Sequence, residues 1–289
     1  SKSMPELPEV ETIARSLRNP IIPENIESAS LSTRPGVVGR VIKSAKLHWP
    51  RSLATPSQDE FEKSLPGQTI LEVGRRGKFL VFHLEHWHLL IHLRMSGDIR
   101  VELGDTPISK HDRMVIYFND GWKMVFHDPR KFGRVWFVKA MNEVTSGLGF
   151  EPFDETLTSV LLWQRFQSTS RKIKSVLLDQ EIIAGLGNIY TDEALFLSGI
   201  HPLTPADELT ELQTESLLRS IRLVLMEGIA RNGASIDWVY RGGEFQNHFN
   251  VYQQTGKPCP VCGTPIQRIV VGQRGTHFCP NCQVDWTNC

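Results

Sequence analysis

Four cysteines near the C-terminus constrain the fold of this 289-residue chain more than any other feature. They form two Cys-x-x-Cys pairs, Cys259 with Cys262 and Cys279 with Cys282, separated by sixteen residues. This spacing is typical of a zinc ribbon, in which two tight turns each offer two thiolates and together complete a tetrahedron. Because four thiolates leave no open position, we expect one structural Zn2+ and no catalytic metal. Two disulfides in a secreted protein are the alternative, but the printed N-terminus has no signal-peptide pattern. The fifth cysteine, Cys289, is expected to be a free thiol.

The rest of the chain changes from β-rich to helical near residue 149. Residues 69–103 and 113–138 are rich in branched and aromatic residues with turn signals between them, which favours a β-sandwich or barrel. An early helix is expected over about residues 8–17. Helical spacing covers 156–167, 172–179, 188–198 and 207–231, and Asn232-Gly233 is a stop signal. The expected fold class is therefore α+β, with a zinc ribbon at the C-terminus.

The charge total hides an uneven distribution along the chain. The sequence has 32 Lys and Arg residues against 32 Asp and Glu residues. Residues 69–139 hold twelve basic and eight acidic side chains, whereas 140–205 hold four and eight. A zero total therefore excludes a protein that coats DNA by bulk charge, but not one that binds a few phosphates through placed residues. No run of about 18 apolar residues occurs, so no membrane span is expected.

A segment of prolines and glutamates, Pro5-Glu6-Leu7-Pro8-Glu9-Val10-Glu11, precedes the first expected helix. If residues 1–4 are removed, the Pro5 nitrogen becomes a secondary amine that can attack an electrophilic sugar carbon and form an iminium ion. Glu6 beside it could then move protons. The local alternative is an ordinary helix N-terminus, where proline is tolerated and acids suit the helix dipole.

Several loops have the composition of phosphate or base contacts. The glycines of 185–193 lead directly into a helix, where backbone N–H groups could bind a phosphate. In the ribbon, Arg274 is a cation in the turn 273–276, which suits a phosphate contact. Three loops of the β region, 75–78, 94–97 and 128–133, pair cations with neighbouring apolar or aromatic residues that could enter a base stack. The alternative for 185–193 is a tight interhelical turn, and the alternative for the ribbon is a purely structural role. The alternative for the three β-region loops is that they are solvated turns.

Taken in order, these motifs resemble the formamidopyrimidine-DNA glycosylase family of bacterial base-excision enzymes over about residues 4–283. The motifs are P-E-L-P-E-V-E-T, G-R-R-G-K, L-R-M-S-G, D-P-R-K-F-G, G-L-G-N-I-Y-T-D-E and a ribbon ending R-G-T-H-F-C-P-N-C. The resemblance implies an N-terminal β-sandwich catalytic domain over 4–140 with a flanking helix, and a linker over 141–150. It also implies a helix-two-turns-helix DNA-binding domain over 151–236, a lesion-capping loop over 237–253 and a zinc finger over 254–289.

The resemblance also implies roles for individual residues. Met95, Arg130 and Phe132 are expected to fill the gap left by an everted nucleotide, which lowers the cost of extruding a base. Glu9 is expected to be a supporting carboxylate, and Glu193 a carboxylate of less certain role. The expected catalytic residues are Pro5 (nucleophile), Glu6 (acid and base), Lys78 and Arg274. The expected DNA contacts are Lys78, Met95, Arg130, Phe132, Lys174, Asn188 and Arg274.

The implied activity is that of a bifunctional DNA glycosylase and AP lyase. It removes oxidised purines, such as 8-oxoguanine and formamidopyrimidines, through an N-terminal proline Schiff base and β,δ-elimination. The expected partner is damaged double-stranded DNA. No membrane and no obligate protein partner are expected, and the protein is expected to be a monomer in the bacterial cytoplasm, associated with the nucleoid.

Two departures from the family pattern keep alternatives open. Ser1-Lys2-Ser3 precede Met4, and if residues 1–4 stay attached the Pro5 nitrogen is a tertiary amide. The chain would then be a non-catalytic binder of damaged DNA. The segment between Asp237 and Phe245 is shorter than the usual loop that caps the everted purine. An endonuclease VIII-like activity on oxidised pyrimidines is therefore a second alternative, although Leu7 differs from the P-E-G-P-E of that branch. A zinc-ribbon scaffold for protein partners is the third.

Overall fold

The computed structural model describes residues 4–18, 36–234 and 243–285. The chain divides into two compact units, which we describe separately. Among the described residues, the first unit contains 4–5 and 9–146, and the second contains 6–8, 147–234 and 243–285. The boundary between units thus falls within the first turn of helix α1 (Leu7–Arg18).

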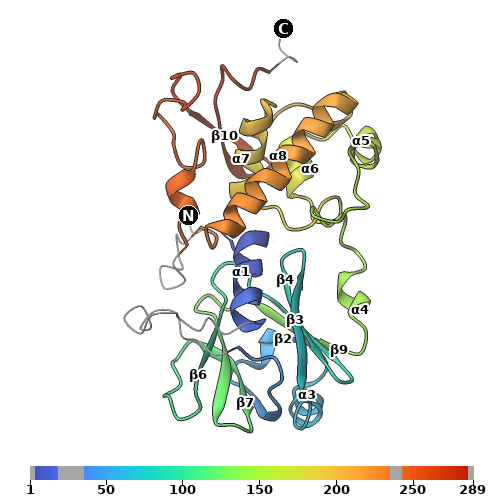
Figure 1. Ribbon diagram of the computed structural model, residues 1–289, viewed down its shortest axis with the longest axis vertical. Helices are drawn as coiled ribbons and strands as arrows, with labels where there is room; N and C mark the ends of the chain where they lie inside the picture. Colours follow the sequence, from blue (N-terminus) through green and yellow to red (C-terminus); the bar gives the residue numbers. More distant parts are fainter. Residues whose placement is uncertain (1–3, 19–35, 235–242, 286–289) are drawn as a thin grey trace. The chain divides into compact units, whose positions relative to one another are not determined.

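The first unit is built on two β-sheets (Figure 1). All strand pairs are antiparallel except β2 with β9. This arrangement confirms the expected N-terminal sheet domain, and the expected β regions became seven strands, β3 to β9. Sequence patterns missed β1, β2 and α3, which lie before residue 69. The four-stranded sheet has the order β1 (Ile42–Leu47), β7 (Asp112–Phe118), β8 (Trp122–His127) and β6 (Asp98–Leu103). The five-stranded sheet has the order β2 (Leu53–Thr55), β9 (Arg134–Val138), β5 (His88–His92), β4 (Phe79–Leu84) and β3 (Ile70–Arg76).

Short helices complete the first unit. A 3-10 turn (Pro50–Ser52) precedes β2, and α3 (Gln58–Ser64) begins at Ser57, whose hydroxyl accepts a hydrogen bond from the Glu60 amide. Helix α4 (Asn142–Thr145) lies in the stretch expected to be a linker. Helix α1 is tied to β3 by Glu11, whose carboxylate pairs with Arg75 as well as with two arginines of its own helix.

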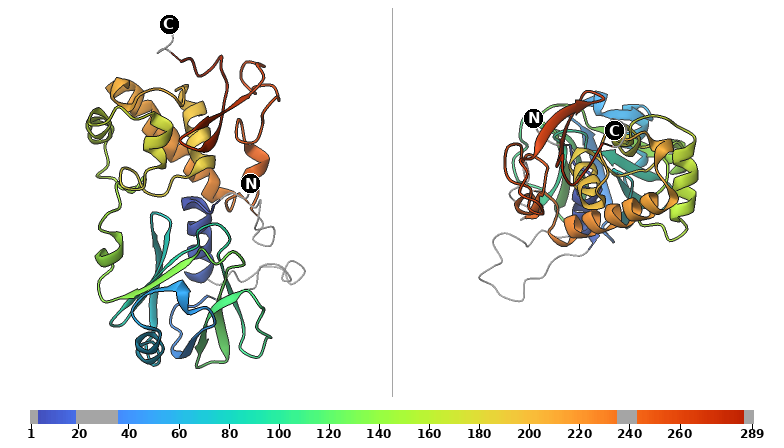
Figure 2. Two further views of the ribbon diagram at one scale, coloured as in Figure 1. Left: turned by 180° about the vertical axis from the view of Figure 1, so that it is seen from behind. Right: turned by 90° about the horizontal axis from the view of Figure 1, so that it is seen from above.

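The second unit packs its helices around one apolar core, and a two-stranded hairpin follows them (Figure 2). Helix α7 is the most buried helix of this unit, because it packs against α6, α8 and the hairpin. The short α6, the turns after it and α7 form the helix-two-turns-helix arrangement. The helices are α5 (Ser159–Gln167), α6 (Ile173–Leu178), α7 (Asn188–Ser198) and α8 (Glu211–Ala230), with 3-10 turns at Ala206–Glu208 and Phe245–His248. The hairpin strands are β10 (Gln267–Val271) and β11 (Arg274–Phe278).

The last long helix starts later than its apolar spacing predicts. Residues 206–208 form a separate 3-10 turn, and α8 begins only at Glu211. The reason is Thr210, whose hydroxyl accepts from the Gln213 amide while the Gln213 side chain accepts from the Thr210 amide. This capping box fixes the helix start. The expected stop is confirmed, because Asn232 and Gly233 both have positive φ. None of the helices in the described ranges is long and apolar enough to cross a membrane.

Candidate functional site

The Glu6 carboxylate caps the N-terminus of helix α7. Its two oxygens accept hydrogen bonds from the amides of Gly187, Ile189 (2.9 Å) and Tyr190 (3.3 Å). Gly187 is the N-cap residue and has no side chain to satisfy these donors, so Glu6 takes that role. Glu6 is 1% exposed. An acid at this position also has a favourable interaction with the helix dipole.

Lys174 lies in the same unit, fully buried on α6. Its ammonium pairs with Asp192 of α7, and the other Asp192 oxygen accepts from the His277 amide at 3.0 Å. Burial lowers the pKa of Lys174, with a smaller contribution from the Arg274 cation, while Asp192 and Glu6 oppose the shift. The carboxylate, the lysine and the ribbon arginine therefore share one electrostatic environment.

Asn188 and Arg274 meet where α7 approaches the ribbon hairpin. The Asn188 amide nitrogen donates to the Gly275 carbonyl at 2.8 Å, which leaves a second N–H for a phosphate. Gly272 and Gln273 form a two-residue turn in which both φ angles are positive, the geometry of a type I′ hairpin turn. Arg274 follows this turn and is exposed. The second unit thus brings together four expected site residues: Glu6, Lys174, Asn188 and Arg274.

The four ribbon cysteines have the arrangement of a zinc site. Their sulfur atoms all lie within 4.8 Å of one another. The Cys259–Cys282 and Cys262–Cys279 pairs are 3.9 and 3.5 Å apart. Tetrahedral coordination with Zn–S bonds of about 2.3 Å requires sulfur atoms about 3.8 Å apart, so the donor set fits one structural zinc ion.

The hydrogen-bond partners of the Glu193 carboxylate differ from those of Glu6 and Asp192. Its oxygens accept from the backbone amides of Asn250, Val251 and Tyr252 at 2.6, 2.9 and 3.0 Å. Burial raises the pKa of Glu193, although these three hydrogen bonds oppose the change. Glu193 therefore anchors the segment that leads into the ribbon.

The first unit contains the remaining expected residues. Pro5 and Glu9 are buried. Lys78 follows Gly77 in the turn between β3 and β4, and is 7% exposed. His92 lies near it, and burial together with the Arg94 and Lys78 cations lowers the pKa of His92 to about 3. A neutral histidine beside this lysine was not expected from the sequence, where strand histidines have no distinguishing pattern.

The three residues expected to enter the DNA gap lie on two neighbouring loops. Met95 is in loop 93–97, between β5 and β6, and is half-buried. Arg130 and Phe132 are in loop 128–133, between β8 and β9, and Phe132 is 53% exposed. The Arg130 guanidinium lies 5.1 Å from the Phe132 ring centre. Pairing of β5 with β9 and of β6 with β8 places the two loops next to each other.

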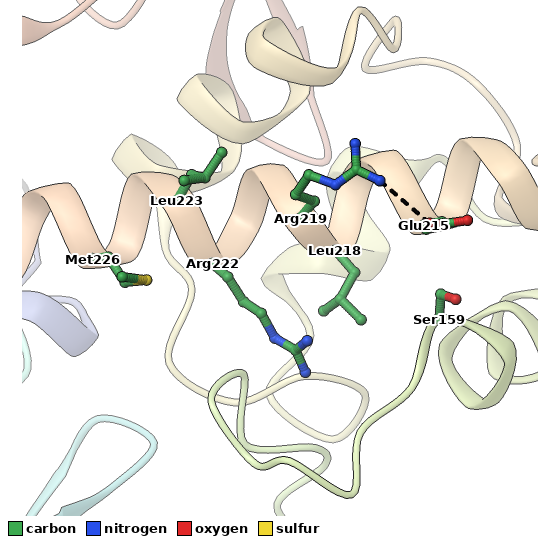
Figure 3. Close-up of a pocket in the computed structure, with 7 residues that line it drawn as sticks. All are labelled: Ser159, Glu215, Leu218, Arg219, Arg222, Leu223 and Met226. Carbon is green, nitrogen blue, oxygen red and sulfur yellow. Dashed lines mark hydrogen bonds and ion pairs between the residues drawn. The ribbon is translucent and has the colours of Figure 1, made fainter.

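A surface pocket of about 320 Å³ lies elsewhere, against helices α5 and α8 (Figure 3). None of the expected site residues lines it. Its charged side chains are already engaged: Arg219 pairs with Glu215, and Arg222 donates to the carbonyls of Pro152 and Leu157. The pocket is therefore no part of the candidate site. Its lining residues are Ser159, Glu215, Leu218, Arg219, Arg222, Leu223 and Met226.

Comparison with known proteins decides the family. Three family models match: the formamidopyrimidine-DNA glycosylase N-terminal domain over residues 20–135, its H2TH domain over 148–239, and the zinc finger found in FPG and IleRS over 256–284. The chain is 45% identical to the formamidopyrimidine-DNA glycosylase of Chloroflexus aggregans, over 97% of this chain and 99% of that protein. The chain belongs to the formamidopyrimidine-DNA glycosylase family. The enzyme of the same name from Bacillus subtilis is 41% identical over similar shares.

Solved structures of the same family agree with the fold. The Lactococcus lactis FPG (MutM) protein, in complex with DNA containing FAPY-dG, has a TM-score of 0.86 and 36% sequence identity. The alignment covers 97% of this chain and all of that one. A complex of the Lactococcus lactis protein with DNA that contains an abasic site gives the same TM-score and coverage.

Proposed function

We propose that this protein is a bifunctional DNA glycosylase and AP lyase of base excision repair that removes oxidised purines from damaged duplex DNA. The observation that carries the proposal is the arrangement around the N-terminus of α7. There Glu6, the residue after Pro5, shares one buried environment with Lys174 and caps the N-terminus of α7, the helix that carries Asn188. The names of the family relatives state the glycosylase part of this activity.

The proposed chemistry starts at the Pro5 nitrogen, once residues 1–4 have been removed. The amine forms a bond to C1′ as the glycosidic bond breaks, and the base leaves with the electron pair and takes a proton from water. Glu6 takes the proton that the Pro5 nitrogen loses and passes it to O4′ as the C1′–O4′ bond opens, which leaves an iminium ion. Loss of a C2′ proton then expels the 3′ phosphate, and a second proton loss expels the 5′ phosphate.

The other residues are proposed to hold the DNA. Lys78, Asn188 and Arg274 contact phosphates, where a charged or amide N–H donor fits a phosphate oxygen. Lys174 is fully buried and paired with Asp192, so we propose that it lies near the DNA backbone without contacting a phosphate. Met95, Arg130 and Phe132 fill the space of the extruded nucleotide. Glu9 supports the active site, and we propose that Glu193 acts indirectly by anchoring the ribbon. The zinc ion is proposed to hold the ribbon that carries Arg274, and takes no part in the reaction.

Borohydride trapping tests the proposal. The protein starting at Pro5 should form a covalent complex with an 8-oxoguanine duplex, and Pro5→Gly should sharply weaken trapping. A chain starting at Ser1 provides the matched control, because its Pro5 nitrogen is acylated. Intact mass spectrometry of the cellular protein identifies which of these chains exists. Equal trapping by Pro5→Gly would remove Pro5 as nucleophile, and a cellular chain beginning at Ser1 would favour a non-catalytic binder.

One observation favours a broader substrate range. A solved complex of the Lactococcus lactis protein, with a TM-score of 0.85, contains DNA with an oxidised pyrimidine. We therefore propose activity on oxidised pyrimidines as a second candidate. The first part of the loop expected to cap the lesion, residues 237–242 of 237–253, lies outside the described residues. Excision rates on 8-oxoguanine and on an oxidised pyrimidine in otherwise identical duplexes rank the two. We also place the protein in the bacterial cytoplasm, acting as a monomer on the nucleoid.

A further inference from the structure

Two loops that carry the gap-filling residues cross between the two sheets of the first unit in opposite directions. Loop 93–97 leaves β5 and enters β6, and loop 128–133 leaves β8 and enters β9. The strand registers align both ends of the two loops: His92 is opposite Arg134 in one sheet, and Asp98 is opposite His127 in the other. The start of each loop therefore lies beside the end of the other, although about 30 residues separate the loops along the chain.

A buried carboxylate joins these loops. Asp128 is fully buried, and its Oδ1 accepts a hydrogen bond of 2.6 Å from the Ser96 hydroxyl, the residue after Met95. The same Ser96 oxygen accepts from the Arg130 amide at 3.0 Å. The second oxygen of the Asp128 carboxylate accepts from the Gly133 amide at 2.8 Å. Asp128 and Gly133 are the first and last residues of loop 128–133, so this bond closes the loop. Three hydrogen bonds thus connect the backbone and side chains next to all three gap-filling residues.

The backbone of Asp128 is held as well. Its carbonyl accepts from Nε of Arg113 at 2.8 Å, and the adjacent Pro129 carbonyl accepts from the same guanidinium at 3.3 Å. Arg113 is 7% exposed and belongs to β7, in the middle of the four-stranded sheet. The loop is therefore fixed to a rigid element rather than to another loop.

Both loops contain backbone conformations that need such support. Arg94, directly before Met95, has φ of 53°, and Lys131, between Arg130 and Phe132, has φ of 63°. A left-handed conformation costs a residue with a side chain about 1 kcal/mol or more, and persists where the surroundings determine it. A β-carbon at Gly133 would lie 2.4 Å from the Phe126 ring and 2.9 Å from the Asp128 carboxylate, so this loop end is also closely packed.

We infer that Ser96 and Asp128 are positioning residues that lock the Met95 loop to the Arg130–Phe132 loop, so that the three side chains enter DNA as one preformed wedge. The inference rests on the proposed function, because it assigns how that site opens a base stack. Insertion of the wedge offsets the cost of unstacking the target base. If the loops moved independently, part of that binding energy would be spent on ordering them.

Ser96→Ala tests the inference, because it removes the hydroxyl that both donates to Asp128 and accepts from the Arg130 amide. We expect single-turnover excision of 8-oxoguanine from duplex DNA to fall about tenfold, which is near the upper end of the factor for losing one typical hydrogen bond. Cleavage of a duplex with a preformed abasic site should change less than about threefold, because no base has to be extruded. A fluorescent 2-aminopurine next to the lesion should report slower or smaller unstacking. Ser96→Thr keeps the hydroxyl and should restore excision.

Ser57→Ala is the matched control. It removes a serine hydroxyl from the same unit, and with it the cap of α3, without contact to either loop. It should leave the ratio of the two activities unchanged. If Ser96→Ala and Ser57→Ala give the same ratio, or if Ser96→Ala lowers both activities equally, the inference is wrong. A wild-type protein inactive on both substrates would instead overturn the proposed function.

Discussion

Gly187→Ala is expected to damage both the stability of the helical unit and its chemistry. A β-carbon on Gly187 would lie 2.6 Å from Cγ and Cδ of Glu6 and 2.9 Å from its Oε1. Non-bonded carbon atoms prefer about 3.5–4.0 Å, so the Glu6 side chain or the start of α7 has to move by about 1 Å. The Gly187 backbone has φ of −129°, which alanine adopts without strain, so the effect comes from the contact alone.

The size of the effect follows from the three hydrogen bonds of the Glu6 carboxylate. Each hydrogen bond from a backbone amide to a charged group contributes about 1.5–3 kcal/mol. Glycine-to-alanine replacement returns about 0.4–1 kcal/mol by restricting the unfolded chain. Loss of one to two hydrogen bonds therefore leaves a net destabilisation of about 1–5 kcal/mol. A displacement of about 1 Å in a group that transfers protons can also lower the rate about 100-fold.

Urea denaturation and single-turnover cleavage of an abasic-site duplex measure the two effects. Gly147→Ala is the control, because its added β-carbon meets no atom within 4 Å and it makes the same change to the unfolded chain. We expect Gly187→Ala to unfold at clearly lower urea than Gly147→Ala and to cleave far more slowly at equal folded fraction. Equal midpoints and equal rates for the two variants would refute the assigned packing of Glu6 against α7.

Three further predictions concern phosphate binding, zinc and pH. Arg274→Ala should weaken binding to damaged duplex and reduce the slope of log affinity against log salt by about one, as loss of one phosphate contact requires; an unchanged slope would exclude that contact. Elemental analysis should find one zinc per chain in the wild type and much less in Cys279→Ser, and full zinc in the variant would contradict the four-thiolate site. Burial would raise the pKa of Asp112, but hydrogen bonds from His127, the Ser109 amide and Arg100 outweigh it and the pKa is lowered. The lowered pKa stabilises the fold above about pH 4 and that stabilisation is lost as pH falls through the folded-state pKa. Asp112→Asn should therefore lower the urea midpoint at pH 7 but much less at pH 3, and an equal loss at both pH values would contradict the assignment.

Local patterns in the sequence predicted the parts of the fold that depend on neighbours in the chain. The two Cys-x-x-Cys pairs predicted the zinc site, because each pair makes its own turn. Apolar spacing found α7 at its actual bounds, residues 188–198, and the stop at Asn232 and Gly233. The start of α8 was placed too early because the apolar pattern continues through a separate 3-10 turn, and only the Thr210 capping box sets the boundary.

Contacts across long sequence separations could not be predicted in the same way. Glu6 meets the amides of α7 across more than 180 residues, and nothing near Glu6 identifies its hydrogen-bond donors. The 128–133 motif indicated a loop with cations, but the buried role of Asp128 depends on strand register in two sheets. The contacts of Glu193 with residues 250–252 could not be predicted either, because one step along a helix from Asp192 turns the side chain by about 100°.

Helix α7 holds several of the side chains discussed above at fixed angles around its axis. Asn188 and Asp192 are four residues apart and both contact the ribbon strand β11, whereas Glu193 holds the segment that leads into the ribbon. A one-residue insertion between Asn188 and Asp192 would rotate one relative to the other by about 100° and shift it by about 1.5 Å. Such a change would separate the Glu6 cap from the ribbon anchors without altering any of the side chains involved. The site therefore requires the helical register of α7 as strictly as it requires the residues that α7 carries.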